Sequence, residues 1–289
     1  MRLLASLTLA LGCLAPASQA AAEKLPLQRT NGAAISAPAA RDTDAWEVFP
    51  SQRGEHPALI SVNKSYSQIA AKDARSSLFR VRLEFKHPTP KGWPPVEESP
   101  GLNRVEDLLE AAVAASGGIQ VGRITVDGHR EFYFYVAFPE KRAQDIVTSV
   151  AAQAAYKLQN VYRRDPAKEG YWKYLYPTAD DQQVIGDMRV LDSLRQQGDI
   201  GTVSRRVTHW AYFPKQGEAQ QFANWANANA YKVSSVAPTA DKSKVGVRFT
   251  HDGTMELEDI THHTIGINRK ARALGGDYDG WETSVERKR

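Results

Sequence analysis

The chain of 289 residues is long enough to bury one large hydrophobic core or two modest ones. Its composition, with 42% hydrophobic and 24% charged residues, is that of a folded globular protein and excludes a disordered or fibrous chain. The 37 lysines and arginines exceed the 33 acidic residues only slightly, which gives a formal charge of +4 without a dense basic stripe. We therefore expect no direct binding to nucleic acid, which usually needs such a stripe.

The first 20 residues have the pattern of a secretory signal peptide. Arg2 supplies a positive charge, residues 3–12 form a hydrophobic stretch, and Ser18 and Ala20 fit the small residues of a cleavage site. Residues 20–22 offer a second cleavage site. The hydrophobic stretch is too short to span a bilayer, and we expect no transmembrane segment elsewhere. The pattern predicts a periplasmic or secreted protein.

The single cysteine of the chain, Cys13, lies inside this predicted signal peptide. The mature protein would then contain neither a disulfide bond nor a reactive thiol. Residues 10–13 also match part of the lipobox of bacterial lipoproteins. A lipid anchor on Cys13 is therefore the alternative to simple cleavage.

The predicted elements of the first domain follow a leader, residues 21–42, that is rich in Ala, Pro, Ser and Thr and has no periodicity. The order is an extra strand, then strand, helix, hairpin, helix and strand. Along the second strand of the hairpin, phenylalanines occupy one face, and Tyr133 and Tyr135 the other. The predicted elements lie at residues 58–66, 78–87, 102–113, 119–126, 130–138, 141–154 and 157–163.

The same order of elements recurs after Pro177, preceded by a helix. Hydrophobic and polar residues alternate regularly along the predicted strands, which indicates antiparallel sheets with helices on one face. The sequence therefore predicts an α+β protein of two ferredoxin-like βαββαβ sandwiches, with domains at 43–178 and 179–289. The elements of the second domain are predicted at 180–197, 203–213, 217–229, 231–250 (a strand pair), 255–274 and 277–286.

The chain lacks a glycine-rich phosphate loop, a nucleophile elbow and a zinc-protease helix, so we expect no cofactor and assign no catalytic residue. Asp259, His262 and His263 stand at helical spacing and could ligate a metal ion, but a solvated helix surface with a local carboxylate–imidazole pair is the favoured interpretation. Residues 129–131, a His-Arg-Glu run after the hairpin turn, are interpreted as a solubilising charge cluster at a strand edge.

A third group of side chains belongs to the first and last strands of the second domain. These strands are neighbours in a ferredoxin-like sheet, so their aromatic, histidine and carboxylate side chains are expected to lie close together. They could form an aromatic core or, if exposed, a binding patch for another protein. The candidate binding residues are His209, Trp210, Tyr212, Asp277, Tyr278, Asp279 and Trp281.

Residues 180–285 resemble the bacterial regulators of ribonuclease E activity B, the RraB family. The likeness rests on residues 194–199, 209–213 and 231–233, and most specifically on 278–282. It implies a ferredoxin-like fold and a protein inhibitor that binds ribonuclease E without catalysis of its own. Residues 44–178 resemble a bacterial domain family of unknown function that is often fused upstream of such a domain, on residues 122–125, 128–132 and 171–177.

These observations favour an exported, non-enzymatic binding or regulatory protein. Ribonuclease E is cytoplasmic, so export implies a different protein partner. The competing hypothesis is a small periplasmic hydrolase or metal-dependent enzyme that uses His209, His262 or His263 with Asp277 or Asp279. A third hypothesis, in which residues 1–20 are not a signal, is a cytoplasmic regulator of RNA decay.

Overall fold

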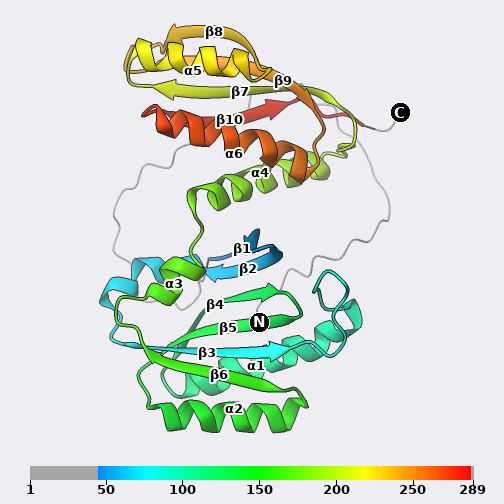
Figure 1. Cartoon of the computed structure of the whole chain (residues 1–289), viewed down its shortest axis with the longest axis vertical. Helices are drawn as coiled ribbons and strands as arrows, with labels where there is room; N and C mark the ends of the chain where they lie inside the picture. Colours follow the sequence, from blue (N-terminus) through cyan, green and yellow to red (C-terminus); the bar gives the residue numbers. More distant parts are fainter. Residues whose placement is uncertain (1–44, 288–289) are drawn as a thin grey trace. The chain divides into compact units, whose positions relative to one another are not determined.

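The computed structural model describes residues 45–287, so the predicted signal peptide, the leader and Cys13 lie outside the described residues. Two antiparallel sheets, of six and four strands, organise the described chain (Figure 1). Helices accompany each sheet, which confirms the predicted α+β class. The two sheets fall in the two predicted domains, 43–178 and 179–289. That each domain folds independently stays a prediction.

The six-stranded sheet of the N-terminal domain has the order β1-β2-β4-β5-β3-β6. Its last four members, with two crossing helices, have the order of a ferredoxin-like sandwich. The hairpin β1–β2 extends that sheet beyond β4. The strands are β1 (Trp46–Arg53), β2 (His56–Asn63), β3 (Ser77–Glu84), β4 (Ile119–Val126), β5 (His129–Val136) and β6 (Leu158–Arg164). The helices are α1 (Ser99–Ala115) and α2 (Glu140–Ala154), with short 3-10 turns at η1 (Lys64–Gln68), η2 (Ala70–Lys72) and η3 (Val96–Glu98).

Strand β1 is the element that the sequence analysis missed, since it predicted one extra strand where the structure has two. Pro50 lies in the middle of β1 and cannot donate a hydrogen bond to a ladder, so its presence argues against a strand. The structure tolerates this proline because β1 is at the edge of the sheet and pairs with β2 alone.

Both faces of the N-terminal sheet contain buried side chains, which different elements cover. Helices α1 and α2 cover one face, where phenylalanines of β3 and β5 form the core. Tyr133 and Tyr135 point to the other face, and they are buried with Tyr66 of η1 and Tyr171 of the short helix α3 (Glu169–Tyr174). The expectation of helices on one face holds for α1 and α2, and α3 with the 3-10 turns adds a second layer over part of the opposite face.

The four-stranded sheet of the C-terminal domain has the order β10-β7-β9-β8, the complete ferredoxin-like arrangement. Helices α5 and α6 pack against one face of it, and α4 packs against α6. A capping box formed by Thr178 and Asp181 starts α4. The strands are β7 (Arg205–Phe213), β8 (Lys232–Pro238), β9 (Val245–Gly253) and β10 (Asp277–Thr283), and the helices are α4 (Ala179–Gln196), α5 (Gln216–Ala228) and α6 (Leu257–Ala273).

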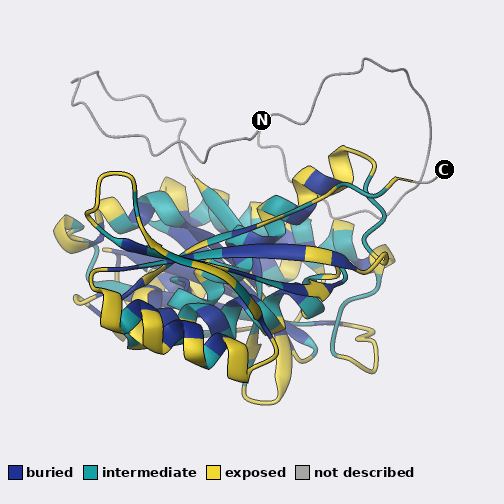
Figure 2. Cartoon of the chain, turned by 90° about the horizontal axis from the view of Figure 1, so that it is seen from above, coloured by how far each residue is buried: buried dark blue, intermediate teal, exposed yellow. Residues whose placement is uncertain are grey.

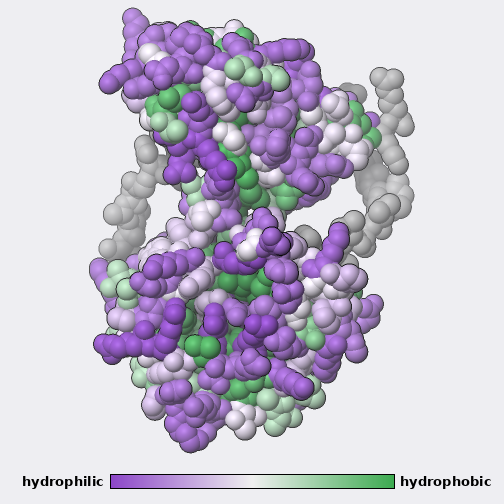
Figure 3. Space-filling view, in the orientation of Figure 1, coloured by the Kyte–Doolittle hydropathy of each residue, from purple (hydrophilic) through white to green (hydrophobic). Residues whose placement is uncertain are grey.

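The burial of individual residues follows these layers. Buried positions line the strands, while exposed positions gather on helix surfaces and loops (Figure 2). On the face that Figure 3 presents, hydrophilic residues predominate and hydrophobic residues occupy limited areas. No helix among residues 45–287 has both the length and the apolar character that crossing a membrane requires.

Candidate functional site

The first and last strands of the C-terminal sheet are neighbours, as expected. In the antiparallel ladder between β7 and β10, Trp281 lies opposite His209 and Tyr278 lies opposite Ala211. A shift in register between Tyr278 and Gly280 marks a β-bulge. The seven candidate residues do not converge on one point, however, because the two faces of the sheet divide them.

His209 faces the helices and is completely buried. Its ring nitrogen Nδ1 lies 2.7 Å from the Tyr278 hydroxyl, and its Nε2 lies 2.8 Å from Nδ1 of His251 on β9. Phe249 stacks on the same imidazole, with 5.1 Å between the ring centres. Both polar atoms of His209 are thus engaged inside the core, where no solvent reaches them.

His251 extends this buried network toward helix α6. Its ring lies 3.8 Å from the ring of His263, centre to centre, and His263 accepts or donates a hydrogen bond of 2.9 Å with the hydroxyl of Tyr231. The Nε2 atom of His251 has no hydrogen-bond partner within the described part of the chain. The sequence analysis did not find this network, because His251 and Tyr231 carry no local motif that separates them from ordinary strand residues.

Burial governs the charge of these imidazoles. Burial, with repulsion from neighbouring histidines, lowers the pKa of His209 to about 2 and that of His251 to about 4. Burial also lowers the pKa of His263, against the attraction of Asp259. For Tyr278, burial and then the charge of Asp187 raise the pKa far above its ordinary value. At neutral pH these groups form an uncharged polar core, which does not suit acid–base chemistry.

Trp281 also faces the helices and is 8% exposed. Its indole Nε1 donates a hydrogen bond of 2.8 Å to Oδ1 of Asp187, a buried carboxyl on α4. Thr264 of α6 donates to the other oxygen of Asp187, and Gln183 to the first. Burial raises the pKa of Asp187, although these three donors oppose the shift. Trp281 is therefore an anchor between the sheet, α4 and α6.

Trp210 and Tyr212 point to the opposite face of the sheet, away from α5 and α6, and both are partly exposed. The guanidinium of Arg248 on β9 lies 5.7 Å from the centre of the Trp210 ring, a cation–π contact. Gly280 and Gly246 lie opposite Trp210 and Tyr212 on the neighbouring strands. Because glycine has no side chain, the Tyr212 ring packs over Gly246, and the space at Gly280 is open.

Asp277 and Asp279 are exposed at the start of β10. Asp277 forms an ion pair of 2.7 Å with Lys244. Asp279 lies close enough to Tyr212 to contribute, after burial, to a raised pKa of that hydroxyl. Neither carboxylate forms a hydrogen bond with the buried His209, whose two ring nitrogens bond to Tyr278 and His251.

The helical group at residues 259–263 matches the favoured interpretation only in part, because His263 turns toward His251 and Tyr231 instead of being fully solvated. Asp259 and His263 lie on one side of α6 with 3.9 Å between carboxylate and imidazole, whereas His262 is exposed. No three His, Cys, Asp or Glu side chains in residues 45–287 are grouped so that they could hold a metal ion.

The interpretation of residues 129–131 as a solubilising edge cluster is wrong. β5, which contains them, is an inner strand between β4 and β3, and His129 is only 8% exposed. Arg130 lies 3.8 Å from Glu106 of α1. Burial, with repulsion from Arg123, lowers the pKa of Arg130 to about 10. A charge cluster after a hairpin turn does not by itself reveal whether its strand is at an edge.

Comparison with known families matches each half of the chain separately. Residues 44–176 match the family of unknown function DUF695, and residues 185–283 match the family described as regulator of ribonuclease activity B. The two predicted resemblances are thereby confirmed. The fold and the family matches define a two-domain α+β protein. It consists of a domain similar to DUF695 followed by a domain similar to the RraB regulators.

Comparison with individual proteins adds no further relationship. None of the curated proteins matches the chain. Among solved structures, an unknown protein from Galdieria sulphuraria shares 10% identity over 73% of this chain and 99% of that one, with a TM-score of 0.19. A protein named as a glycine cleavage system transcriptional repressor shares 10% identity over 72% of this chain and 98% of that one, with a TM-score of 0.20. Scores this low carry no argument about fold or function.

Replacement of Trp281 by alanine should destabilise the protein strongly, because it removes a buried indole and a hydrogen-bond donor to Asp187. We expect a loss of about 3–5 kcal/mol in the free energy of unfolding, measured by urea denaturation. Trp210→Ala, a matched loss of an indole on the open face, should cost about 1 kcal/mol or less. A urea midpoint for Trp281→Ala equal to that of the parent would show that the indole is not an anchor.

The buried histidines should make stability depend on pH. The pKa values of His209 and His251 are lower in the folded state than the unfolded value of about 6.5. The free energy of unfolding therefore has its full value above pH 6.5 and decreases as the pH falls toward the folded pKa values. Each histidine should lower the free energy of unfolding by about 1.4 kcal/mol for each pH unit below 6.5. Urea unfolding between pH 7.5 and 5 should therefore give a shallower pH dependence for His209→Gln than for the parent. The exposed control His262→Gln should keep the parental slope, and equal slopes in the two variants would contradict the prediction.

Proposed function

We propose that this is an exported, non-enzymatic binding protein whose C-terminal domain binds another protein through the open face of its sheet. The observation that carries the proposal is the group of Trp210, Tyr212 and Arg248 on the face that α5 and α6 leave free. Trp, Tyr and Arg are the residues that contribute most often to the energetic centres of protein interfaces.

The local geometry favours contact with a partner. Gly280, opposite Trp210, leaves open space on that strand, and the Tyr212 ring packs over Gly246. Arg248 adds a guanidinium that can stack on a ring or form a bidentate hydrogen bond. Charged residues around this face are of both signs, including the pair Arg206–Asp252, which suits a protein partner better than a polyanion.

The absence of an assembled acid–base pair in the C-terminal domain supports a binding role over the hydrolase hypothesis. His209 is buried with both ring nitrogens bonded, and the exposed Asp277 is paired with Lys244. An enzyme would need such groups to meet in one accessible site. The name of the matched family, a regulator of ribonuclease activity, is in keeping with a protein that acts by binding.

The signal-like pattern of residues 1–20 supports export, and export would separate the protein from cytoplasmic ribonuclease E. The binding surface would then serve a partner outside the cytoplasm. In this proposal the protein shares with the named family its mode of action, which is binding without catalysis. Its partner differs from the partner of that family.

The partner can be identified by introducing a photo-crosslinking amino acid at Tyr212 and, as a control, at the exposed His262 on α6. We expect a specific adduct from position 212 only. Binding of the identified partner should weaken by roughly 2 kcal/mol, or about 30-fold, in Trp210→Ala and in Arg248→Ala. Arg272→Ala, which removes an exposed arginine from α6, should bind like the parent. Equal affinities in all three variants would exclude this face.

Export can be tested by mass spectrometry of the mature protein. Cleavage after Ala20 should give an N-terminus at Ala21, and cleavage at the second site an N-terminus at Glu23. A diacylated Cys13 at the N-terminus would establish the lipoprotein alternative. An intact Met1 together with a cytoplasmic location would refute export and favour the hypothesis of cytoplasmic regulation.

A further inference from the structure

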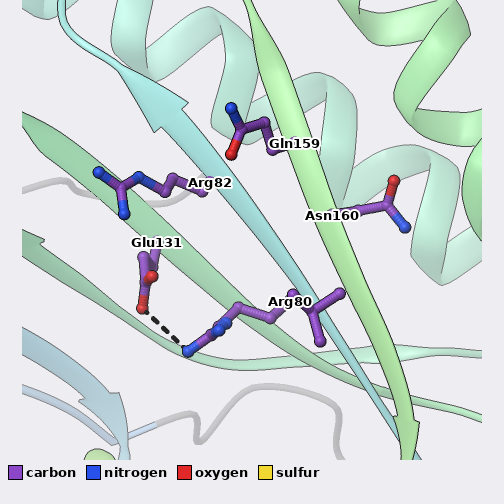
Figure 4. A pocket seen from close by; sticks show the side chains of 6 residues that line it. Arg80, Arg82, Glu131, Gln159 and Asn160 are labelled. Atoms are coloured by element: carbon purple, nitrogen blue, oxygen red, sulfur yellow. Dashed lines mark hydrogen bonds and ion pairs between the residues drawn. The ribbon is translucent and has the colours of Figure 1, made fainter.

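A shallow hollow lies on the face of the N-terminal sheet opposite α1 and α2, where β3, β5 and β6 meet. Figure 4 shows its side chains, with Glu131 between two arginines. The apolar part of this face, over β1, β2 and β4, is covered, whereas the part over β3 and β6 is charged. The lining residues are Arg80, Arg82, Glu131, Gln159, Asn160 and Val161.

The two arginines retain unused hydrogen-bond donors. Arg80 donates from Nη1 to Oε2 of Glu131 over 3.4 Å, and Arg82 donates from Nε to Glu84 over 2.7 Å. A guanidinium has five N–H donors in a planar fork. Arg80 interacts with the Tyr133 hydroxyl as well as with Glu131, whereas Arg82 bonds only to Glu84 within the described chain. The two side chains are 33% and 41% exposed. Such forks match the two oxygens of a carboxylate.

Glu131 supplies an acceptor in the same hollow. Its Oε2 accepts hydrogen bonds from Arg80 and from the Tyr133 hydroxyl, the latter at 2.9 Å. The other oxygen, Oε1, lies 3.9 Å from Nε2 of His129, beyond hydrogen-bond distance, and accepts no hydrogen bond from residues 45–287. This carboxylate is therefore held in place by one oxygen and has the other available to an N–H donor.

The edge strand β6 contributes neutral groups that complete the lining. The side-chain amide of Gln159, which lies beside Arg82 in the β3–β6 ladder, makes no hydrogen bond to any other residue of the described chain and can both donate and accept. Asn160 lies opposite the buried Val81, so its side chain points to the other face of the sheet. Val161 is 44% exposed and forms an apolar wall. An amide beside an apolar wall suits the peptide bond and small side chain of a peptide.

We propose that this hollow binds a small zwitterion, an α-amino acid or short peptide. The ligand's carboxylate lies on the guanidinium forks of Arg82 and Arg80, and its ammonium group donates to Oε1 of Glu131. Gln159 bonds to its peptide group. This site is separate from the protein-binding face of the C-terminal domain, and neither proposal depends on the other.

The charge balance of the hollow selects a zwitterion over an anion. The two guanidiniums are matched by the carboxylates of Glu131 and Glu84, so the site is close to neutral. A phosphate or a polyanion would bring uncompensated negative charge beside Glu131, whereas a zwitterion adds one charge of each sign. A shallow, partly exposed site predicts weak binding, with a Kd of roughly 0.1–1 mM for a ligand of this size.

The proposal can be tested by an NMR titration of the ¹⁵N-labelled chain, from which residues 1–20 have been removed, with trialanine. Amide shifts should change in β3 and β6 and saturate in the stated range. Trialanine amide, which lacks the carboxylate, and N-acetyl-trialanine, which lacks the ammonium group, should each bind at least 10-fold more weakly. Equal binding of either blocked peptide would overturn the assignment of the corresponding contact, and no saturable shift with trialanine would overturn the site.

Variants separate the site from general charge effects. Arg82→Gln removes a partly exposed guanidinium and should weaken trialanine binding at least 10-fold, with an amide spectrum that otherwise matches the parent. Arg104→Gln, which removes an exposed arginine from α1, should leave binding unchanged. Glu131→Gln should weaken binding of trialanine but not of its N-acetyl form. Equal affinity in Arg82→Gln and the parent would refute the proposal.

Discussion

The β-bulge between Tyr278 and Gly280 is the constraint on which the C-terminal domain depends. Side chains of a regular strand alternate between faces, so residues 278 and 281 would point in opposite directions. The extra residue of the bulge brings both Tyr278 and Trp281 to the helix-covered face. Gly280 has a φ of 122°, in the region that favours glycine, so this residue type permits the bulge. One irregular position thus aligns both the histidine network and the Trp281 anchor.

The carboxyl of Asp187 joins the elements that meet at this anchor. Asp187 is 1% exposed, and its carboxyl group accepts hydrogen bonds from three donors, one each on α4, α6 and β10. A buried acid without such partners would be strongly destabilising. The network therefore attaches α4, which lies outside the ferredoxin-like unit, to the rest of the domain. It also explains why an aromatic residue of the closing strand is structural and does not belong to a binding surface.

The two domains share a strand order and use the face opposite their crossing helices differently. In the N-terminal domain α3 and the 3-10 turns cover the apolar part of that face, and the uncovered part contains Arg80, Arg82 and Glu131. In the C-terminal domain the corresponding face has no helix of α4 to α6 against it and presents Trp210 and Tyr212. Similar sheets can therefore offer chemically different surfaces. One is a polar hollow suited to a zwitterion, and the other is an aromatic surface suited to a protein.

The sequence by itself determined the α+β class, the order of the elements and the two family resemblances, because hydrophobic periodicity and short local motifs encode them. It also placed β7 beside β10, from the order of strands in a ferredoxin-like sheet. It did not predict β1, whose central proline is tolerated only at an edge, or the buried position of His129. Which side chains share a face follows from the tertiary structure, since a single bulge reverses alternation and residues 187 and 251 are distant in the chain from their partners 281 and 209. Burial and hydrogen bonding across such distances separate the structural Trp281 from the exposed Trp210, and no local pattern contains that information.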